Sequence, residues 1–135
     1  MSLVTHWIGG KPCPAASGAV FDDIAPATSE VLAQVSRGDA TDIAAAVAAA
    51  GAALKGPWGD TTRLERADIL DRIADGLEAR LDTLARLESE DTGKPISLAR
   101  RIDIPRAVAN FRFFAGAIRH DETPCHQMPD ALNYT

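Results

Sequence analysis

The chain has 135 residues, of which 46% are hydrophobic and 24% charged, and this suits a single domain that buries roughly two thirds of its unfolded surface. A net charge of −5 argues against nucleic-acid binding, and no apolar run approaches the roughly 20 residues of a membrane span. The N-terminal sequence MSLVTHWIGG lacks a secretory pattern and two cysteines make no disulfide framework, so we expect a reduced, cytoplasmic protein without membrane contacts.

Four short apolar segments in the first quarter of the chain predict β-strands. They are His6–Ile8, Lys11–Cys13, Val20–Ile24 and Val31–Val35. Gly9 and Gly10 separate the first two, and glycine adopts the positive φ angles of a tight hairpin turn at little cost. A proline-containing turn separates the other two. We therefore expect hairpins before any helix.

From Asp39 onwards the spacing of apolar residues changes from 2 to 3.6, which predicts helices. Asp39 and Asp42 have the spacing of a capping box at the start of the first helix. One face of that helix is apolar: Ile43, Val47, Ala50 and Leu54. The sequence Gly56-Pro57-Trp58-Gly59 ends it.

Two more helices follow, and a last one comes after a short connection. The second helix begins at Thr61 or Thr62, and its predicted buried stripe is Ile69, Ile73 and Leu77. The third carries Leu81, Leu84 and Leu87 and ends at Gly93, where glycine suits a left-handed C-cap. Pro95 starts a short helical turn.

Asp103 is the predicted N-cap of the last helix, which covers residues 104–119. The inward face of this helix contains Ile104, Val108, Phe111, Ala115 and Ile118. A separate stripe, roughly opposite, contains Arg106, Asn110, Phe113 and Ala117. After residue 130 the sequence begins to look like another strand.

Seven segments occur in a fixed order along the chain: IGG (Ile8–Gly10), APATSEV (Ala25–Val31), the capped Ala-rich helix, ALKGPWG (Ala53–Gly59), DTGKP (Asp91–Pro95), DIPR (Asp103–Arg106) and NFRFFAG (Asn110–Gly116). Together they resemble the aldehyde dehydrogenase family. ALKGPWG, DIPR with NFRFF, and the terminal NYT are most similar to the branch that oxidises 2-hydroxymuconic or 2-aminomuconic semialdehyde. The family usually has Asn-Pro-Ala-Thr-Gly where this chain has Ala25-Pro26-Ala27-Thr28-Ser29.

The resemblance implies an α/β fold. Residues 1–135 would be the N-terminal layer of a Rossmann-like coenzyme-binding domain, with β-hairpins followed by four to five helices and the rest of the domain missing. Residues 131–135 would lead into the β-strand arm through which the family forms oligomers. The full-length protein would then be a homodimer or homotetramer.

The resemblance also implies oxidation of a small-molecule aldehyde to the acid with NAD. A cysteine nucleophile forms a thioester and a glutamate base assists its hydrolysis. The oxyanion segment, the coenzyme-binding residues, the base and the nucleophile all come later than residue 135 in the family. We therefore assign no catalytic or coenzyme-binding residue here, expect this chain alone to be inactive, and leave NAD versus NADP open.

Arg106 is the first candidate site residue. A muconic semialdehyde carries a carboxylate remote from its aldehyde, and arginine's planar fork suits a carboxylate well. In the resembled branch the DIPR arginine is the implied carboxylate clamp, and the start of the last helix would add a positive field. Asn110 and Phe113 could line the same wall. The alternative is a solvated Arg106 that balances Asp103.

Asp91 and Ile24 are the second candidate. In the resembled family, the aspartate of the D-T/N-G-K turn and a backbone carbonyl matching Asp23-Ile24 bind a structural Na⁺ or K⁺. Carboxylate and carbonyl oxygens suit such hard cations. The alternative is an aspartate that accepts hydrogen bonds from nearby backbone amides in a turn.

Three readings of the whole chain stay open. The first is a portion of a muconic-type semialdehyde dehydrogenase. The second is a stand-alone, non-enzymatic helical module that binds a partner through exposed apolar faces. The third is a fragment of a betaine or aliphatic aldehyde dehydrogenase.

Overall fold

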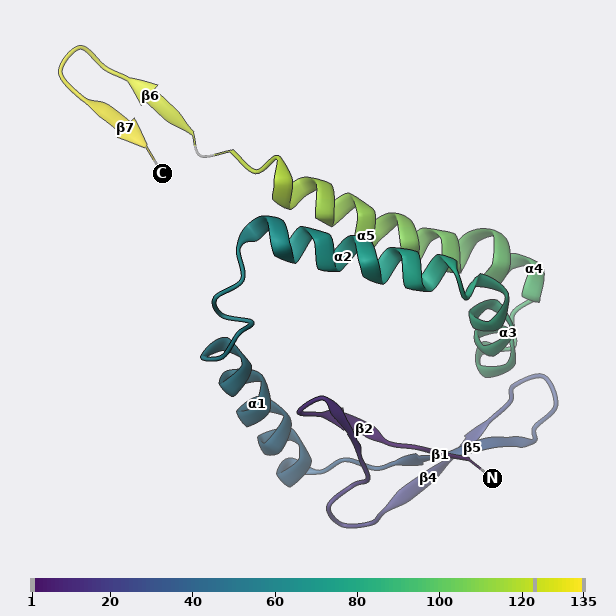
Figure 1. Ribbon diagram of the computed structural model, residues 1–135. Helices are drawn as coiled ribbons and strands as arrows, with labels where there is room; N and C mark the ends of the chain where they lie inside the picture. Colours follow the sequence, from purple (N-terminus) through teal and green to yellow (C-terminus); the bar gives the residue numbers. More distant parts are fainter. Residues whose placement is uncertain (1, 123, 135) are drawn as a thin grey trace.

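The computed structural model describes residues 2–122 and 124–134, so Met1, Thr123 and Thr135, the last residue of the NYT motif, lie outside it. The elements are β1 (Ser2–Val4), β2 (His6–Ile8), β3 (Lys11–Cys13), β4 (Val20–Ile24), β5 (Val31–Ser36), α1 (Ala40–Leu54), α2 (Arg63–Glu78), α3 (Leu81–Thr92), α4 (Ile96–Leu98), the π-helix η1 (Ala99–Asp103), α5 (Ile104–Arg119), β6 (Cys125–Gln127) and β7 (Leu132–Tyr134). The strands, α1, α2 and α3 follow one another around an open ring, and α5 lies along α2 (Figure 1). The predicted order of strands and then helices is confirmed.

Two small sheets form the N-terminal part of the ring. β2 and β3 pair antiparallel through Gly9 (φ +62°) and Gly10 (φ +79°), which confirms the first predicted hairpin. β4 pairs antiparallel with β5, as expected, and β1 pairs parallel with the other edge of β5. The sequence did not predict β1, because three residues are too few to show alternation and its partner is distant in the chain.

α1 begins with the predicted capping box. The carboxylate of Asp39 accepts hydrogen bonds from the backbone N–H groups of Thr41 (2.7 Å) and Asp42 (3.4 Å), and the carboxylate of Asp42 accepts one from Asp39 N–H (3.0 Å). Asp42 is only 8% exposed and also accepts a hydrogen bond from Ala16 N–H at 2.9 Å. This carboxylate therefore ties the start of α1 to the loop between β3 and β4.

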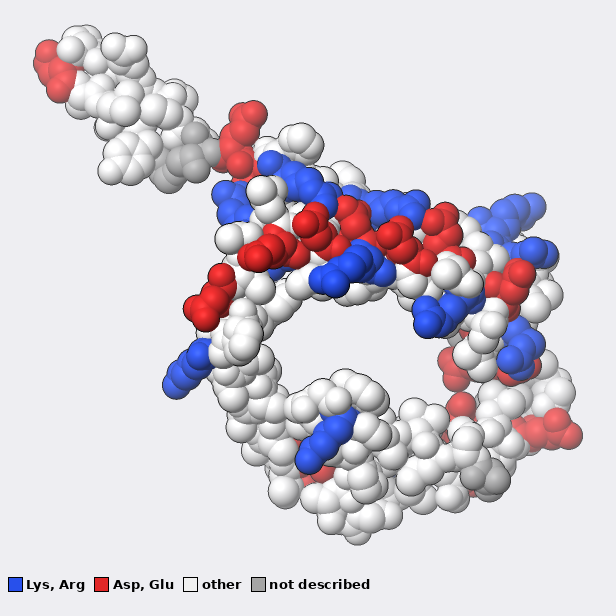
Figure 2. All heavy atoms as spheres, in the orientation of Figure 1, with Lys and Arg blue, Asp and Glu red and all other residues white. Residues whose placement is uncertain are grey.

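The apolar face of α1 has no cover within the described part of the chain. Ile43 is 65% exposed, and Val47 and Leu54 are each 66% exposed. A helix that is apolar over most of its surface normally lies in a protein interior. Most of α1 is free of charged side chains in Figure 2, next to the opening that the ring encloses.

α2 and α5 pack on each other along most of their length. Ala67 and Ala74 of α2 and Ala115 of α5 are fully buried. Small side chains at these positions let the two helix backbones approach closely. The predicted inward face of α5 is confirmed, because all five of its residues are buried or half-buried.

The predicted buried stripe of α2 is wrong in part. Ile73 is 39% exposed, and Ile69 and Leu77 are only half-buried. At 100° per residue the centre of this stripe lies about 110° round the helix from Ala67 and Ala74. The helix α5 covers the alanine face instead of the isoleucine stripe.

α3 ends at Gly93 in the left-handed conformation (φ +74°), as predicted. A Cβ atom at this position would lie 3.1 Å from Cβ of Pro26. The turn between β4 and β5 therefore contacts the end of α3, and this contact helps to close the ring.

α4, η1 and α5 form one uninterrupted helical run, so the prediction that Asp103 caps a new helix is wrong. Asp103 has helical angles (φ −68°, ψ −52°) and its side chain caps no amide. Pro105 explains the irregular turn, because in a regular α-helix its ring would clash with the carbonyl of Arg101. The wider π turn of η1 lies immediately before it.

β6 and β7 form an antiparallel hairpin that projects from the end of α5 (Figure 1). All of its described residues are exposed. The predicted final strand is confirmed as Leu132–Tyr134, whereas its partner β6 was not predicted.

Candidate functional site

Two of the three arginines of α5 are held by α2. Arg112 lies 3.0 Å and 2.6 Å from two carboxylates, and Arg119 lies 2.6 Å and 2.7 Å from two others. These carboxylates form one row on α2: Asp68, Asp71, Asp75 and Glu78. Figure 2 shows the resulting mixture of acidic and basic side chains along α2 and α5. Each exposed pair stabilises the fold only slightly, but together they occupy both guanidinium groups.

Arg106 is the remaining arginine of α5, and its side chain is exposed. Within residues 2–122 and 124–134, no carboxylate forms an ion pair with its guanidinium. At 100° per residue, Arg106 lies about 120° round the helix from Arg112. The acidic row of α2 therefore faces a different side of α5, which leaves Arg106 available to an external anion.

Asn110 and Phe113 share this exposed side of α5 with Arg106. The three positions fall within about 60° of arc, and all three are exposed, Phe113 by 67%. The ring of Phe113 meets that of Phe114 edge to face, with centroids 5.3 Å apart. We call Arg106, Asn110 and Phe113 the α5 stripe. It combines a cation, an amide and an aromatic ring on one rigid helix.

An apolar groove of about 550 Å³ runs beside the α5 stripe. Its lining residues are Glu78, Leu81, Pro105, Val108, Ala109, Arg112 and Phe113. Phe113 belongs to both the groove and the stripe. A ligand that contacts Arg106 with an anionic end would thus find apolar surface further along the same helix.

Lys94 lies at the junction between α3 and the helical run that leads to Arg106. Its Nζ atom is 2.8 Å from Asp103 and 3.0 Å from Glu88. The hydrogen bonds to Asp103 and then to Glu88 raise the pKa of Lys94 above its ordinary value. Asp103 is therefore neutralised by Lys94 and not by Arg106, which does not support the alternative that Arg106 balances Asp103.

The expected contribution of a helix N-terminus to the field at Arg106 is wrong. An N-terminal dipole requires N–H groups without intrahelical partners, and Arg106 follows a helical run that begins a full ten residues earlier, at Ile96. The positive charge at this place comes from the guanidinium itself.

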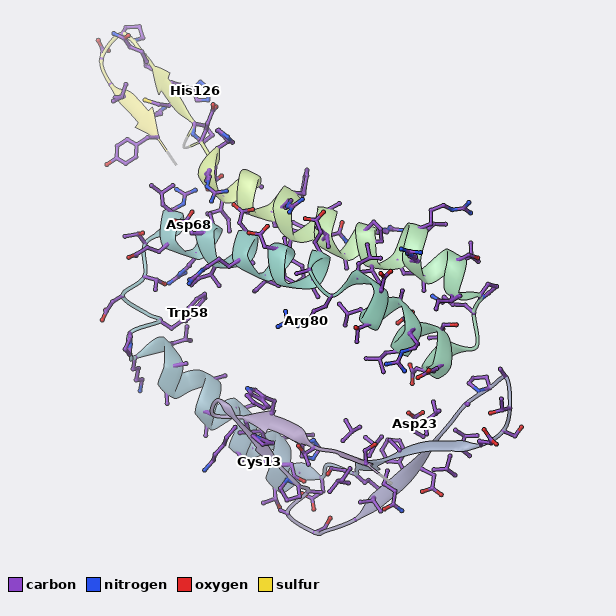
Figure 3. The ribbon with its side chains drawn as sticks, turned by 45° about the vertical axis from the view of Figure 1, so that its right-hand side comes forward. Cys13, Asp23, Trp58, Asp68, Arg80 and His126 are labelled. Atoms are coloured by element: carbon purple, nitrogen blue, oxygen red, sulfur yellow. The ribbon has the colours of Figure 1, made fainter. Side chains whose placement is uncertain are left out.

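The predicted cation-binding residues lie on two segments that contact each other. Asp91 is in the last turn of α3 and Ile24 ends β4, and a Cβ atom added at Gly93 would lie 3.1 Å from Cβ of Pro26, just after β4. No described backbone amide donates a hydrogen bond to the carboxylate of Asp91, so the turn alternative is not realised. Asp23, next to Ile24, lies on β4 (Figure 3). A carboxylate and nearby carbonyls fit a monovalent cation, but this remains a prediction.

The junction of β5 and α1 does not provide a cradle for the phosphates of NAD. Phosphate groups bind at helix N-termini with free N–H groups, and the strand-to-helix junction here is that of β5 and α1. Asp39 already accepts the hydrogen bonds of the first turn of α1 at 2.7 Å and 3.4 Å. A side chain at Gly38 would meet His6 at 3.1 Å, so this junction is also filled sterically.

The cysteines and histidines do not form a further site within the described residues. Cys13 is half-buried on β3, and Cys125 is exposed on β6 beside His126, on the projecting hairpin (Figure 3). No cluster of three metal-ligating side chains occurs in residues 2–122 and 124–134. In the same residues no helix is long and apolar enough to cross a bilayer.

Comparison with known proteins agrees with this architecture. The family model for the aldehyde dehydrogenase family matches residues 13–135. The chain belongs to the aldehyde dehydrogenase family. A 2-hydroxymuconic semialdehyde dehydrogenase of a Pseudomonas species is 47% identical to it, over 99% of this chain and 29% of that protein. A 2-aminomuconic semialdehyde dehydrogenase of Bos taurus is 46% identical, over 98% and 27%.

Solved aldehyde dehydrogenases have the same fold. An NAD⁺ complex of the enzyme from Bacillus cereus superposes with a TM-score of 0.92 at 37% identity, over 98% of this chain and 28% of that one. The chain therefore spans less than a third of the length of the relatives that it matches. The predicted family and the truncated α/β fold are both confirmed.

Two features of the site were missed by the sequence analysis. Lys94 has no local pattern that predicts its two carboxylate partners, because Asp103 reaches it through the π turn. The contact of Gly93 with Pro26 joins segments far apart in the chain. The only sequence signal for the ion pairs of Lys94 was the presence of this lysine in the DTGKP motif.

Proposed function

We propose that the chain is the N-terminal segment of the coenzyme-binding domain of an NAD-dependent aldehyde dehydrogenase, and that its full-length protein oxidises 2-hydroxymuconic or 2-aminomuconic semialdehyde. The named relatives that support this choice of aldehyde are 47% and 46% identical to the chain. In this proposal residues 131–135 lead into an oligomerisation arm, and the full-length enzyme is a cytoplasmic homodimer or homotetramer. Residues 1–135 alone are inactive.

The observation that carries the proposal is the guanidinium of Arg106, which forms no ion pair with any carboxylate among residues 2–122 and 124–134. It binds the remote carboxylate of the substrate, while Asn110 and Phe113 flank the carbon chain. The arginines that α2 holds are already neutralised, so they offer little to a second carboxylate. NAD, when bound by the rest of the protein, accepts the hydride, and no residue of this chain takes part in that step.

Arg106→Ala in the full-length enzyme tests the proposal. We expect kcat/KM for a carboxylated aldehyde to fall about 100-fold, equivalent to about 3 kcal/mol for a lost charged hydrogen bond. The value for an uncharged aldehyde of the same length should stay within about twofold. Arg101→Ala is a matched control, because it removes an exposed arginine from η1 without changing the α5 stripe.

An unchanged ratio between the two aldehydes would reject the muconic substrate and favour a betaine or aliphatic aldehyde. Sequencing the gene past codon 135 tests the larger claim. We expect the reading frame to continue into an oxyanion segment and a cysteine motif.

A second candidate function is a stand-alone interaction module, and the exposed apolar face of α1 favours it. Size-exclusion chromatography of the 135-residue chain separates the two. A monomer or a defined complex supports the module, whereas aggregation supports a segment that needs the rest of its enzyme.

A further inference from the structure

The side chain of Lys94 connects α3 to the turn that precedes Arg106. Its ammonium group lies 2.8 Å from Asp103 and 3.0 Å from Glu88, and all three side chains are about one-third exposed. The backbone of Lys94 is also fixed, because its carbonyl accepts a hydrogen bond of 2.7 Å from the hydroxyl of Ser89. Lys94 is therefore held at both ends, and it holds Asp103 in turn.

Asp103 and Arg106 are three positions apart on one continuous helical run. An acidic residue three positions before an arginine is well placed for an intrahelical ion pair. That pair does not form here, although both residues have the helical backbone that it requires. The carboxylate of Asp103 is directed to Lys94 instead.

We propose that Lys94 is a positioning residue for the reaction: it keeps the carboxylate of Asp103 away from Arg106 and thereby leaves the guanidinium free for the carboxylate of the aldehyde. This inference rests on the proposed function, since it concerns the anion that Arg106 binds. Lys94 itself does not touch the substrate. Its hydrogen bonds to Asp103 and then to Glu88 raise its pKa further above neutral pH.

Without the ammonium group of Lys94, the carboxylate of Asp103 competes with the carboxylate of the substrate for the guanidinium of Arg106. The released carboxylate pairs with Arg106 and also repels an approaching anion, and each effect at an exposed position changes affinity about two- to threefold. Lys94→Met is therefore expected to raise KM for a carboxylated aldehyde about fivefold, with kcat unchanged within about twofold. KM for an uncharged aldehyde of the same length should not change.

A second substitution separates this role from simple bracing of the fold. In Lys94→Met combined with Asp103→Asn, the carboxylate three positions before Arg106 is gone, so KM for the carboxylated aldehyde should return to within about twofold of the parent value. Lys94→Arg should behave as the parent, because it keeps the charge. Arg100→Met is the matched control: it removes a cation that lies 2.8 Å from Asp82 but leaves Asp103 held by Lys94.

The experiment is steady-state kinetics of the full-length enzyme with both aldehydes, together with circular dichroism of each variant. A double variant that stays as impaired as Lys94→Met would overturn the proposal, since loss of a brace is not repaired by removing a second partner. Lys94→Gln serves in place of Lys94→Met if the latter does not fold, with the same expected direction.

Failure of this inference can be distinguished from failure of the proposed function. If Arg106→Ala abolishes the preference for the carboxylated aldehyde while Lys94→Met leaves KM unchanged, only the role of Lys94 is rejected. If Arg106→Ala leaves the preference intact, both are rejected. In the Arg106→Ala background, Lys94→Met loses the effect that comes from pairing with Arg106, so its remaining effect on KM should be no more than about two- to threefold.

Discussion

Two regions of this molecule contrast with each other. One is the pair of helices α2 and α5, and the other is the single helix α1. α2 and α5 bury alanines completely against each other, and ion pairs between their exposed side chains also connect the two helices. α1 is of similar length and more apolar, yet its face of Ile43, Val47 and Leu54 is exposed. The first region has its packing partner within the chain, whereas the second is attached chiefly at its N-terminal end, through Asp42.

The difference indicates where the segment can be stable alone and where it depends on other protein. Burial of apolar area is the main favourable term in folding, so exposed apolar side chains on α1 contribute little to its stability here. The exposed face of α1 is consistent with a chain that covers only 27–29% of the length of these relatives.

The largest expected effect comes from overfilling the α2–α5 contact. Ala115→Leu adds a branched side chain at a fully buried position, and overpacking of this kind costs roughly 2–3 kcal/mol. Ala48→Leu on exposed α1 is the matched control and should change the free energy of unfolding by less than about 0.5 kcal/mol. Urea denaturation of both variants measures the difference. Equal losses would contradict the contrast between the two regions.

Substitution of two glycines should change the stability of the protein by smaller amounts than Ala115→Leu does, and in opposite directions. Gly93→Ala places a side chain in the left-handed region (φ +74°) and 3.1 Å from Pro26, which we expect to destabilise the protein by about 1–2 kcal/mol. Gly51 lies inside α1 with open space around it, so Gly51→Ala should stabilise the chain by about 0.5–1 kcal/mol. Thermal unfolding of the two variants should shift in opposite directions. A shift of the same sign would show that the end of α3 is not fixed by its contact with Pro26.

The sequence predicted the features of the fold that depend on neighbours in the chain. The capping box of Asp39 and Asp42, the glycine hairpin and the left-handed Gly93 are each determined by a few adjacent residues, and all are confirmed. The exposed face shared by Arg106 and Phe113 followed from helical periodicity alone. The roles of these residues stay predictions, because exposure on a shared helix face does not show which molecule they bind.

The errors concern residues whose partners are distant or whose geometry is irregular. Asp103 before Pro105 has the pattern of an N-cap, but the π turn lets the helix continue through it and Lys94 takes its carboxylate. The stripe of Ile73 on α2 is apolar but does not face α5, and periodicity cannot say which of two faces a partner will cover. Tertiary contacts decided both cases.

The last prediction concerns the attachment of α1, and its effect on the free energy of unfolding is seen only at acidic pH. Hydrogen bonds from the backbone N–H groups of Asp39 and then Ala16 lower the pKa of Asp42 below its ordinary value of 3.8. A carboxylate with a depressed pKa in the folded state stabilises the fold fully above its unfolded pKa, and this contribution is lost as the pH falls through the folded pKa. Unfolding free energy should therefore decrease between about pH 5 and pH 2, and Asp42→Asn should reduce that slope.

Glu65 offers a control in the other region, because it occupies the same position in the capping box of α2. Its pKa is lowered by hydrogen bonds from the backbone and then the hydroxyl of Thr62, but it holds no distant segment. Glu65→Gln should thus reduce the acid slope without loosening the N-terminal sheets, whereas Asp42→Asn should also speed hydrogen exchange at Ala16. If Asp42→Asn, like Glu65→Gln, leaves exchange at Ala16 unchanged, α1 is not attached through its buried carboxylate. The contrast between α2 with α5, which pack on each other, and α1, which is attached at one end, would then be wrong.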